Sequence, residues 1–342
     1  MFSSNFKVLH TPLEIAGQVG LICEFLRKSG YKASGFNYFD TYLKYQKVFQ
    51  TEAYELIKVL EKFIDYYDIF HFHNSCSIIE DHRDIHMIKE AGKKMLMHHR
   101  GNDVRFRTLA RRGRNYTNPY VNAENSFHDV QMVKNLKLFA DTMHAAIVQD
   151  YELYPYVVDY YQEKGKPVYV LPRLIDTNLL QPAYPHKTTK CPVIVHAPTH
   201  RQFKGSDIIE KIIAQLKKEQ PLHYINIEGK SHEETLKYYR QADIIIDQIL
   251  CGAYGNVSVE GMALGKPVIC YIRPDLRKTC FRDLPIVSAN PDTLYDQLKK
   301  LLKDPARRYE LGKAGRRYAE KHHEGRYVIA QLIKIYDHIL QS

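Results

Sequence analysis

Residues 252–272 read GAYGNVSVEGMALGKPVICYI: a glycine-bearing loop, a short helical segment, a Gly-Lys-Pro stop and an apolar strand. The peptide N–H groups of such a loop, and the N-terminus of the helix that follows it, favour phosphate groups. Glu260 lies inside the helical segment, where a carboxylate can accept hydrogen bonds from both hydroxyls of a ribose. The stretch predicts an αβ unit that can hold a nucleotide diphosphate; the alternative is a plain αβ unit whose Glu260 is merely solvated.

Strands and helices alternate over the whole chain, which predicts an α/β protein with parallel sheets covered by helices on both faces. A first series of apolar runs predicts strands at 7–11, 68–73, 94–99, 145–149 and 167–171. A second series predicts strands at 192–198, 222–229, 242–248 and 266–272. Helical periodicity lies between them, at 17–29, 52–66, 206–219, 233–241, 292–303 and 306–321.

Two such series in one chain predict two doubly wound, Rossmann-like domains. We expect the first at residues 1–172 and the second at residues 191–325, because the prolines and poor periodicity of residues 173–190 are typical of a linker. Residues 326–342 have the amphipathic period of a helix, which we expect to cross back to the first domain.

The composition and the start of the sequence favour a globular protein over a membrane-spanning or secreted one. The 342 residues are 44% apolar, which suffices for two cores, and they include no apolar run of the roughly 18 residues that a membrane span needs. The start of the chain lacks the pattern of a secretory signal, so we expect a cytoplasmic protein. None of the six cysteines forms a C-x-x-C pair, so neither zinc nor a redox dithiol is indicated.

The net charge of +10 fits an anionic ligand, an anionic membrane surface or nucleic acid, and does not choose among them. Because the chain shows no nucleic-acid-binding motif, we expect no nucleic-acid partner.

Candidate site residues of the first half follow expected strands. Gly17 lies in a loop whose glycines either let a ligand approach the backbone or serve the turn alone. One strand ends in His98 and His99, which point to opposite faces, so at most one of them faces a cleft. The catalytic candidates here are His99, Arg100 and Asp103; a structural role for the histidine is the alternative.

Residues 104–123 contain five arginines and no acidic residue. Arginine forks suit phosphate, and polybasic segments bind anionic membranes. We expect a phosphorylated or lipid-linked acceptor, or the inner face of the plasma membrane, to contact Arg105, Arg107, Arg111 and Arg112. A solvated loop is the alternative.

Loops of the second half predict a diphosphate site. Arg201 and Lys204 lie where an expected strand hands over to a helix, so two cations meet a helix N-terminus. The alternative is an exposed turn whose helix is capped by Ser206 or Asp207. The loop at 252–255 and the strand end before it supply further candidates, Gly255, Asn256 and Val257 for the diphosphate, and Asp247 and Tyr254 for the donor sugar or the loop.

Together these motifs resemble the GT-B glycosyltransferases, most closely the bacterial group classed as glycosyltransferase family 4. The resemblance spans nearly the full length, and its most specific match is SVEGMALGKPVI (258–269). The other matching segments, in chain order, are PLEIAGQ (12–18), FHFHN (70–74), RGNDVR (100–105), LPRLIDTNLLQP (171–182), THRQFKGSD (199–207) and YRQADI (239–244).

The resemblance implies two Rossmann-like domains facing a cleft, with a UDP- or GDP-sugar bound mainly by the second. Glu260 would hold the ribose, and Arg201 and Lys204 would neutralise the diphosphate as the leaving group develops charge. Such transferases need no metal and no permanently bound cofactor, and the absence of a D-x-D motif agrees. Their chemistry transfers the sugar to a hydroxyl acceptor with retention of configuration.

The chain departs from the family pattern in three places. The carboxylate that the family usually carries eight residues before the ribose-binding one is replaced by Gly252. The histidine of the family's HGSD-like segment reads Arg100, with His99 before it. The spacing from Arg201 to Lys204 is shorter than the family's.

We therefore expect a metal-independent glycosyltransferase of the hexosyltransferase type. Its expected role is polysaccharide biosynthesis: transfer from a nucleotide sugar to a glycan or lipid-linked acceptor of the cell envelope or an exopolysaccharide, with peripheral contact to the membrane. The alternatives are a nucleotide-sugar epimerase or a phosphorylase on the same fold, and a non-catalytic relative that binds a sugar nucleotide or glycan.

Overall fold

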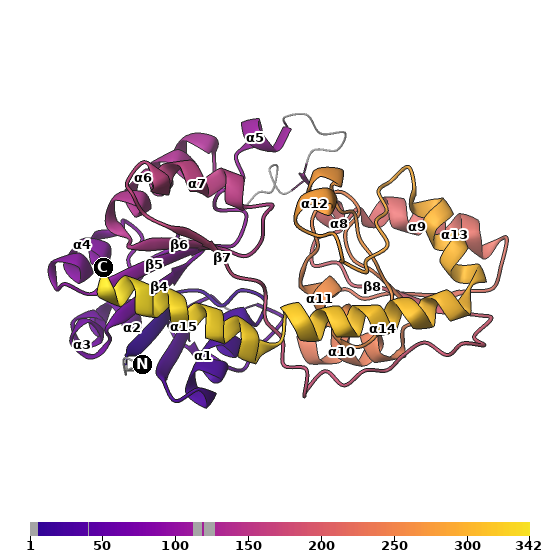
Figure 1. Ribbon diagram of the computed structural model, residues 1–342, viewed down its shortest axis with the longest axis horizontal. Helices are drawn as coiled ribbons and strands as arrows, with labels where there is room; N and C mark the ends of the chain where they lie inside the picture. The colour runs from indigo at the N-terminus through magenta and orange to yellow at the C-terminus, as the bar shows by residue number, and fades with distance from the viewer. Residues whose placement is uncertain (1–5, 40, 112–117, 120–126) are drawn as a thin grey trace. The chain divides into compact units, whose positions relative to one another are not determined.

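The computed structural model describes residues 6–39, 41–111, 118–119 and 127–342 (Figure 1). The chain divides into two compact units. The first comprises residues 1–110, 121–174 and 325–342, and the second comprises residues 111–120 and 175–324.

The first unit is built on a seven-stranded sheet of order β3-β2-β1-β4-β5-β6-β7, with every neighbouring pair parallel. This order is doubly wound, and its switch point lies between β1 and β4. The strands are β1 (Lys7–Thr11), β2 (Lys32–Asn37), β3 (Phe49–Gln50), β4 (Ile69–His73), β5 (Lys94–His99), β6 (Ala145–Val148) and β7 (Val168–Val170).

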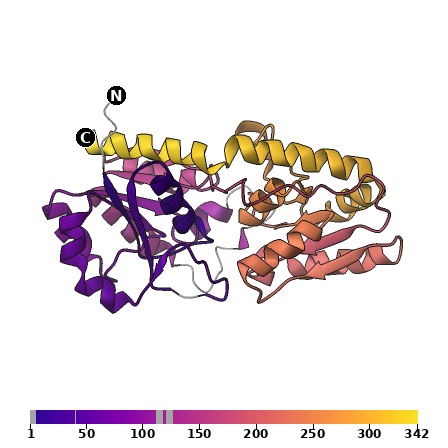
Figure 2. The same cartoon turned by 90° about the horizontal axis from the view of Figure 1, so that it is seen from below.

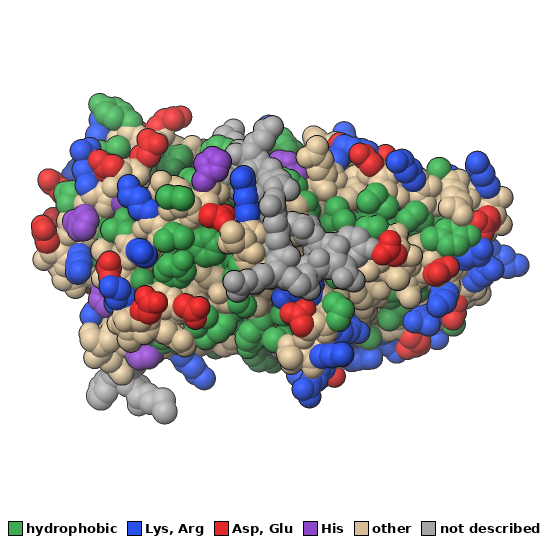
Figure 3. All heavy atoms as spheres, turned by 90° about the horizontal axis from the view of Figure 1, so that it is seen from above, with side chains coloured by type: hydrophobic (Ala, Val, Ile, Leu, Met, Phe, Trp, Pro, Cys, Tyr) green, Lys and Arg blue, Asp and Glu red, His purple; other side chains and the backbone are tan. Residues whose placement is uncertain are grey.

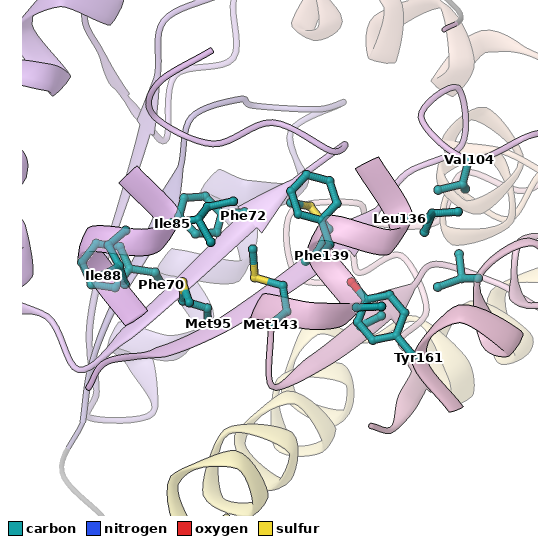
Figure 4. Packing of buried hydrophobic residues seen from close by; sticks show 14 of the residues in the cluster. Phe70, Phe72, Ile85, Ile88, Met95, Val104, Leu136, Phe139, Met143 and Tyr161 are labelled. Atoms are coloured by element: carbon teal, nitrogen blue, oxygen red, sulfur yellow. The ribbon is translucent and has the colours of Figure 1, made fainter. Parts of the chain in front are cut away.

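Helices cover both faces of this sheet, which explains why β4 and β6 are buried along their whole length. One core packs Phe70 and Phe72 of β4 against helices α4, α6 and α7 (Figure 4). The opposite core packs Ile69 and Leu96 against α1 and α15. The helices are α1 (Gln18–Lys28), α2 (Ala53–Lys58), α3 (Leu60–Tyr66), α4 (Arg83–Glu90), α5 (Arg107–Arg111), α6 (Asp129–Thr142), α7 (Tyr154–Gln162) and α15 (Gly325–Gln341).

The C-terminal helix α15 belongs to the first unit, and Figure 2 shows it lying along that unit. Its first residue, Gly325, packs so closely on α1 that a Cβ there would lie 2.4 Å from the ring of Phe25. Only glycine permits this approach of the two helices.

The second unit is built on a four-stranded parallel sheet of order β11-β10-β8-β9. Its strands are β8 (Val193–His196), β9 (His223–Asn226), β10 (Ile244–Ile246) and β11 (Val268–Ile269). Apolar clusters lie on both faces of the sheet. Its helices are α8 (Arg201–Lys204), α9 (Ser206–Lys217), α10 (His232–Gln241), α11 (Asn256–Ala263), α12 (Pro274–Thr279), α13 (Leu294–Lys303) and α14 (Pro305–His322).

Every strand segment expected from the sequence contains a strand, and the α/β class is confirmed. The single helix expected at 52–66 is wrong: Val59 leaves the helical conformation (φ −102°, ψ 5°) and separates α2 from α3. Valine is β-branched and loses side-chain freedom in a helix, so Val59 has a low helix propensity at the point where the expected helix is interrupted.

Candidate functional site

Asp247, directly after β10, organises the glycine loop of the second unit. Its Oδ1 accepts a hydrogen bond from Lys204 Nζ (2.7 Å), and its Oδ2 accepts from the Gly255 N–H (3.0 Å) and the Ser258 hydroxyl (2.7 Å). Burial alone would raise the pKa of Asp247, but Lys204 and the other donors outweigh it and hold the pKa below its usual value. The structure therefore brings Lys204, Asp247 and Gly255 together, and the Gly255 N–H is already bonded within the protein.

The N-terminus of α11 follows this loop. Gly255 occupies the N-cap position, and no side chain caps the helix. The first N–H groups of a helix have no partner within it, so those of Asn256 and Val257 carry the positive end of the helix dipole. This end of α11 is chemically suited to an oxyanion, and the expected binding of a diphosphate there stays a prediction.

Glu260, in the second turn of α11, accepts a hydrogen bond from His232 Nε2 to Oε1 (2.7 Å). Its side chain is 13% exposed. His232 begins α10, and although burial lowers its pKa, the Glu260 carboxylate outweighs burial and raises it above 6.5. Sequence reasoning missed His232, because its place next to Glu260 depends on packing between two helices.

The guanidinium of Arg201 is bonded to acidic side chains and is not held free for a phosphate. Its guanidinium binds both oxygens of Glu210 (3.0 and 2.6 Å) and one oxygen each of Asp207 (2.8 Å) and Glu228 (2.6 Å). These hydrogen bonds, led by those to Glu210, raise the pKa of Arg201. A diphosphate would have to replace three carboxylates here, so the assignment of Arg201 to the diphosphate stays a prediction.

The loop itself explains the glycine at position 252. Gly252 has a left-handed backbone (φ +84°), and a Cβ there would lie 2.5 Å from Cγ of Arg273. The aliphatic part of Arg273 thus occupies the space into which a side chain at position 252 would extend. The ring of Tyr254 points into the core and its hydroxyl bonds His323 (3.2 Å), so Tyr254 can offer a ligand its backbone and not its ring.

At the end of β5, the catalytic candidates of the first unit form a compact network. Asp103 Oδ2 accepts from His99 Nδ1 (2.7 Å) and from the Ser75 hydroxyl (3.0 Å). Its Oδ1 accepts the N–H groups of Arg100 (3.1 Å) and Gly101 (2.9 Å). The side chains of His99 and Asp103 are completely buried. They hold the loop in place in this structure, and a catalytic role for them stays a prediction.

A chain of buried histidines covers the other face of the same strands. Arg100 Nη2 donates to His73 Nδ1 (3.2 Å), and His73 Nε2 pairs with His10 Nδ1 (3.1 Å). The Tyr336 hydroxyl of α15 bridges His10 Nε2 (3.1 Å) and His71 Nδ1 (2.7 Å). His71 Nε2 then meets Nδ1 of the last member, His98 (3.3 Å).

Because the Arg100 guanidinium can only donate hydrogen bonds, the direction of every hydrogen bond in this histidine chain is fixed. His73 must accept at Nδ1 and carry its proton on Nε2, and the same holds in turn for His10, His71 and His98. Burial is the main cause that lowers the pKa of all four imidazoles, with the charge of Arg100 contributing. The alternation in FHFH (70–73) predicts that His71 and His73 lie on one face of β4. Their partners on β1, β5 and α15 are brought to that face only by the fold.

Three of these histidines, His10, His71 and His73, bring ring nitrogens within 4.8 Å of one another, the spacing of a metal site. The geometry argues against such a site. The rings of His71 and His73 are stacked, 4.7 Å apart and within 9° of parallel, whereas a metal lies in the plane of each imidazole that binds it. Both nitrogens of each of the three rings are also engaged in the chain described above.

In the glycine loop after β1, backbone N–H groups donate to a carboxylate of the same loop. Glu14 accepts the N–H groups of Val19 (3.2 Å) and Gly20 (2.8 Å) at the start of α1. Gly17 caps that helix with a left-handed backbone (φ +74°), and a Cβ there would lie 3.0 Å from the ring of Tyr45. The glycine thus meets a steric need, and its predicted contact with a ligand is untested.

The arginine candidates are only partly described. Arg105 is buried and bonds Glu152 (2.9 Å), whereas Arg107 begins α5, where its N–H donates to Asp129 (2.9 Å). The side chain of Arg111, and Arg112 as a whole, lie outside the described residues. On the face drawn in Figure 3, Lys and Arg are interspersed with Asp and Glu. None of the described helices is long and apolar enough to cross a bilayer.

No family model matches the sequence, and no curated protein matches it either. The fold, however, is similar to solved structures over nearly the whole chain. A glycosyltransferase from Rickettsia africae matches 99% of this chain and 100% of its own, with a TM-score of 0.67 and 15% identity. Sucrose-phosphate synthase from Thermosynechococcus elongatus matches 98% of this chain and 99% of its own, with a TM-score of 0.65 and 14% identity.

The chain has the GT-B fold. A third similar structure, HepE from Anabaena in complex with UDP and glucose, supports the same conclusion, with a TM-score of 0.63, 11% identity and coverage of 97% of this chain and 99% of that one. The two parallel sheets of this chain are the two Rossmann-like sheets of GT-B, and the expected fold class is confirmed.

Proposed function

We propose that the chain is a glycosyltransferase that takes its sugar from a nucleotide diphosphate bound by the second unit. The observation that carries the proposal is the arrangement along α11. An uncapped helix N-terminus begins beside Lys204, and Glu260 follows in the next turn. The helix end suits a diphosphate and the carboxylate suits a ribose.

The N–H groups of Asn256 and Val257 would bind the diphosphate, since the Gly255 N–H already donates to Asp247. Lys204 is buried and neutralised by Asp247, so it would act chiefly by holding the loop in its binding shape. Glu260 would accept the ribose hydroxyls while His232 orients its carboxylate. The complex of HepE with UDP-glucose supports a nucleotide sugar as the ligand of this fold.

The finer features follow from the resemblance given above. We propose that the first unit binds a glycan or lipid-linked acceptor, with His99, Arg100 and Asp103 on that side. We further propose that the reaction retains configuration, needs no metal, and contributes to a cell-envelope glycan or exopolysaccharide at the membrane.

A non-catalytic sugar-nucleotide-binding protein is the second candidate. One observation favours it: the backbone and Arg273 exclude a carboxylate at position 252, where related transferases have one. Binding of a nucleotide sugar without transfer to any acceptor, and without hydrolysis, would identify this case.

Isothermal titration of UDP, GDP and their glucose conjugates tests the proposal. We expect binding of one nucleotide, and a loss of about 1–3 kcal/mol of binding free energy in Glu260→Gln through weakened charged hydrogen bonds. Glu310→Gln, at a 60%-exposed site on α14, is the matched control and should bind as the wild type does. Absence of binding by every nucleotide would contradict the proposal.

A further inference from the structure

Three arginines of the first unit are buried at or after the carboxyl ends of its strands. Arg100, Arg105 and Arg173 are only 7%, 8% and 8% exposed. Arg105 bonds Glu152 (2.9 Å), and Arg173 bonds Asp150 (3.0 Å). Arg100 bonds a neutral ring instead, His73. Among the described residues, none places a carboxylate oxygen within 4.0 Å of the Arg100 guanidinium.

Two carboxylates, Glu14 and Asp103, lie near enough for their charge to raise the pKa of Arg100, but their oxygens bond other donors and not its guanidinium. Both oxygens of Asp103 accept from His99, Ser75 and two backbone N–H groups. Glu14 accepts two N–H groups at the start of α1. His73 cannot become the counter-ion, because an imidazole is either neutral or positively charged.

Most of the guanidinium's hydrogen-bonding capacity is unused. An arginine has five N–H donors, and one contact to a protein acceptor is formed here. Nε is buried without a partner. Burial lowers the pKa of Arg100 to about 10, so the group is still a cation at neutral pH.

The position of this cation is fixed by its backbone. The backbone N–H of Arg100 donates to Asp103, and the backbone carbonyl of Arg100 accepts from the Gln149 side chain (2.7 Å). Arg100 also follows β5 directly, at the carboxyl edge of the sheet, where open parallel sheets bind their ligands. A buried cation whose N–H donors are mostly unused destabilises a protein, and such costs persist mainly at functional sites.

We propose that Arg100 binds an oxyanion, a phosphate or a carboxylate, carried by the acceptor substrate. The acceptor assignment rests on the proposed function, whereas the anion site rests on Arg100 alone. The guanidinium fork would donate to two oxygens of the anion, and the anion would form the direct ion pair that this buried cation has with no carboxylate of the described residues. The acceptor would therefore be a sugar or lipid phosphate, or an acidic sugar, instead of a neutral one.

Thermal unfolding of the ligand-free protein gives the first test. Arg100→Gln removes a buried charge that forms no direct ion pair and should leave Tm unchanged or raise it. Arg173→Gln, the matched control at an equally buried arginine, leaves the buried Asp150 carboxylate without its ion-pair partner and should lower Tm. An equal fall of Tm in both variants would show that Arg100 is a structural residue and would overturn the proposal.

Titration with sodium phosphate and with glucuronate, at constant ionic strength, gives the second test. We expect one of them to bind the wild type and to bind Arg100→Gln at least tenfold more weakly, with Arg100→Lys between the two. Binding of phosphate identifies a phosphorylated acceptor, and binding of glucuronate an acidic sugar. If neither anion binds, or if both bind the Gln variant as tightly as the wild type, the proposal is wrong.

UDP and GDP binding, measured on the same samples, separates this proposal from the proposed function. Arg100→Gln should retain the nucleotide affinity of the wild type. Loss of anion binding with intact nucleotide binding supports both proposals. Nucleotide binding without any anion effect of Arg100 removes only the anion site, and anion binding without nucleotide binding removes only the transferase.

Discussion

The Lys204 ammonium and the Asp247 carboxylate lie 2.7 Å apart, and both side chains are almost completely buried, at 8% and 0% exposure. The pair joins the end of α8 to the end of β10, and the second oxygen of Asp247 holds the loop before α11. The glycine loop that we propose as part of the nucleotide site is thus held in shape by a buried ion pair whose two members are 43 residues apart.

Asp247→Asn should destabilise the protein by about 3–5 kcal/mol, because it leaves the buried Lys204 charge uncompensated. Urea unfolding measures the change. Glu310→Gln, which breaks the exposed pair with Lys187, should cost less than about 1 kcal/mol. Similar losses in the two variants would show that the Lys204–Asp247 pair does not hold the loop.

Gly252→Ala should cost about 1–3 kcal/mol of stability from backbone strain, and more from the contact with Arg273. Gly229→Ala is the control, since its backbone is also left-handed (φ +66°) but no atom lies within 4 Å of the added Cβ. The difference between the two unfolding free energies isolates the contact with Arg273. If the two glycine variants are equally stable, Arg273 does not exclude a side chain at position 252.

The direction of the histidine chain can be checked by the 15N shifts of the four imidazoles. At neutral pH, His10, His71, His73 and His98 should all be neutral with the proton on Nε2. A proton on Nδ1 of any of them would reverse the chain at that ring.

Tyr336→Phe should cost about 2–4 kcal/mol, because it leaves ring nitrogens of two buried histidines, His10 and His71, without a partner. Urea unfolding measures the loss, and Tyr327→Phe on the exposed face of the same helix should leave stability unchanged. A Tyr336→Phe protein as stable as the wild type would mean that the hydroxyl does not join α15 to the histidines.

The His232–Glu260 pair should stabilise the protein most at low pH. The folded-state pKa of His232 is raised above 6.5, so its contribution is fully present below that pH and is lost as the pH rises through the folded-state pKa. The stability difference between the wild type and His232→Gln should therefore shrink as the pH rises above about 6.5. A difference that is independent of pH would contradict the ion pair.

The sequence alone indicated much of the fold, because parallel strands and amphipathic helices are encoded by short periods of residue type. The strand β2 (KASGFN) was missed, since its glycine and serine interrupt the apolar run. The helices α4, α6 and α7 were not predicted individually either. Glu260 and Lys204 were identified as candidates because a glycine loop between strand and helix marks a binding edge in the sequence itself.

By itself, then, the sequence determined the α/β class, the two sheets and the glycine loop with Glu260 behind it. Only the tertiary structure decided which charges are neutralised. It placed three carboxylates around Arg201, Asp247 against Lys204 and a neutral histidine beside Arg100. The partners come from strands and helices distant in the chain, and whether a charge is paired depends on separations of a few ångströms that no local period encodes.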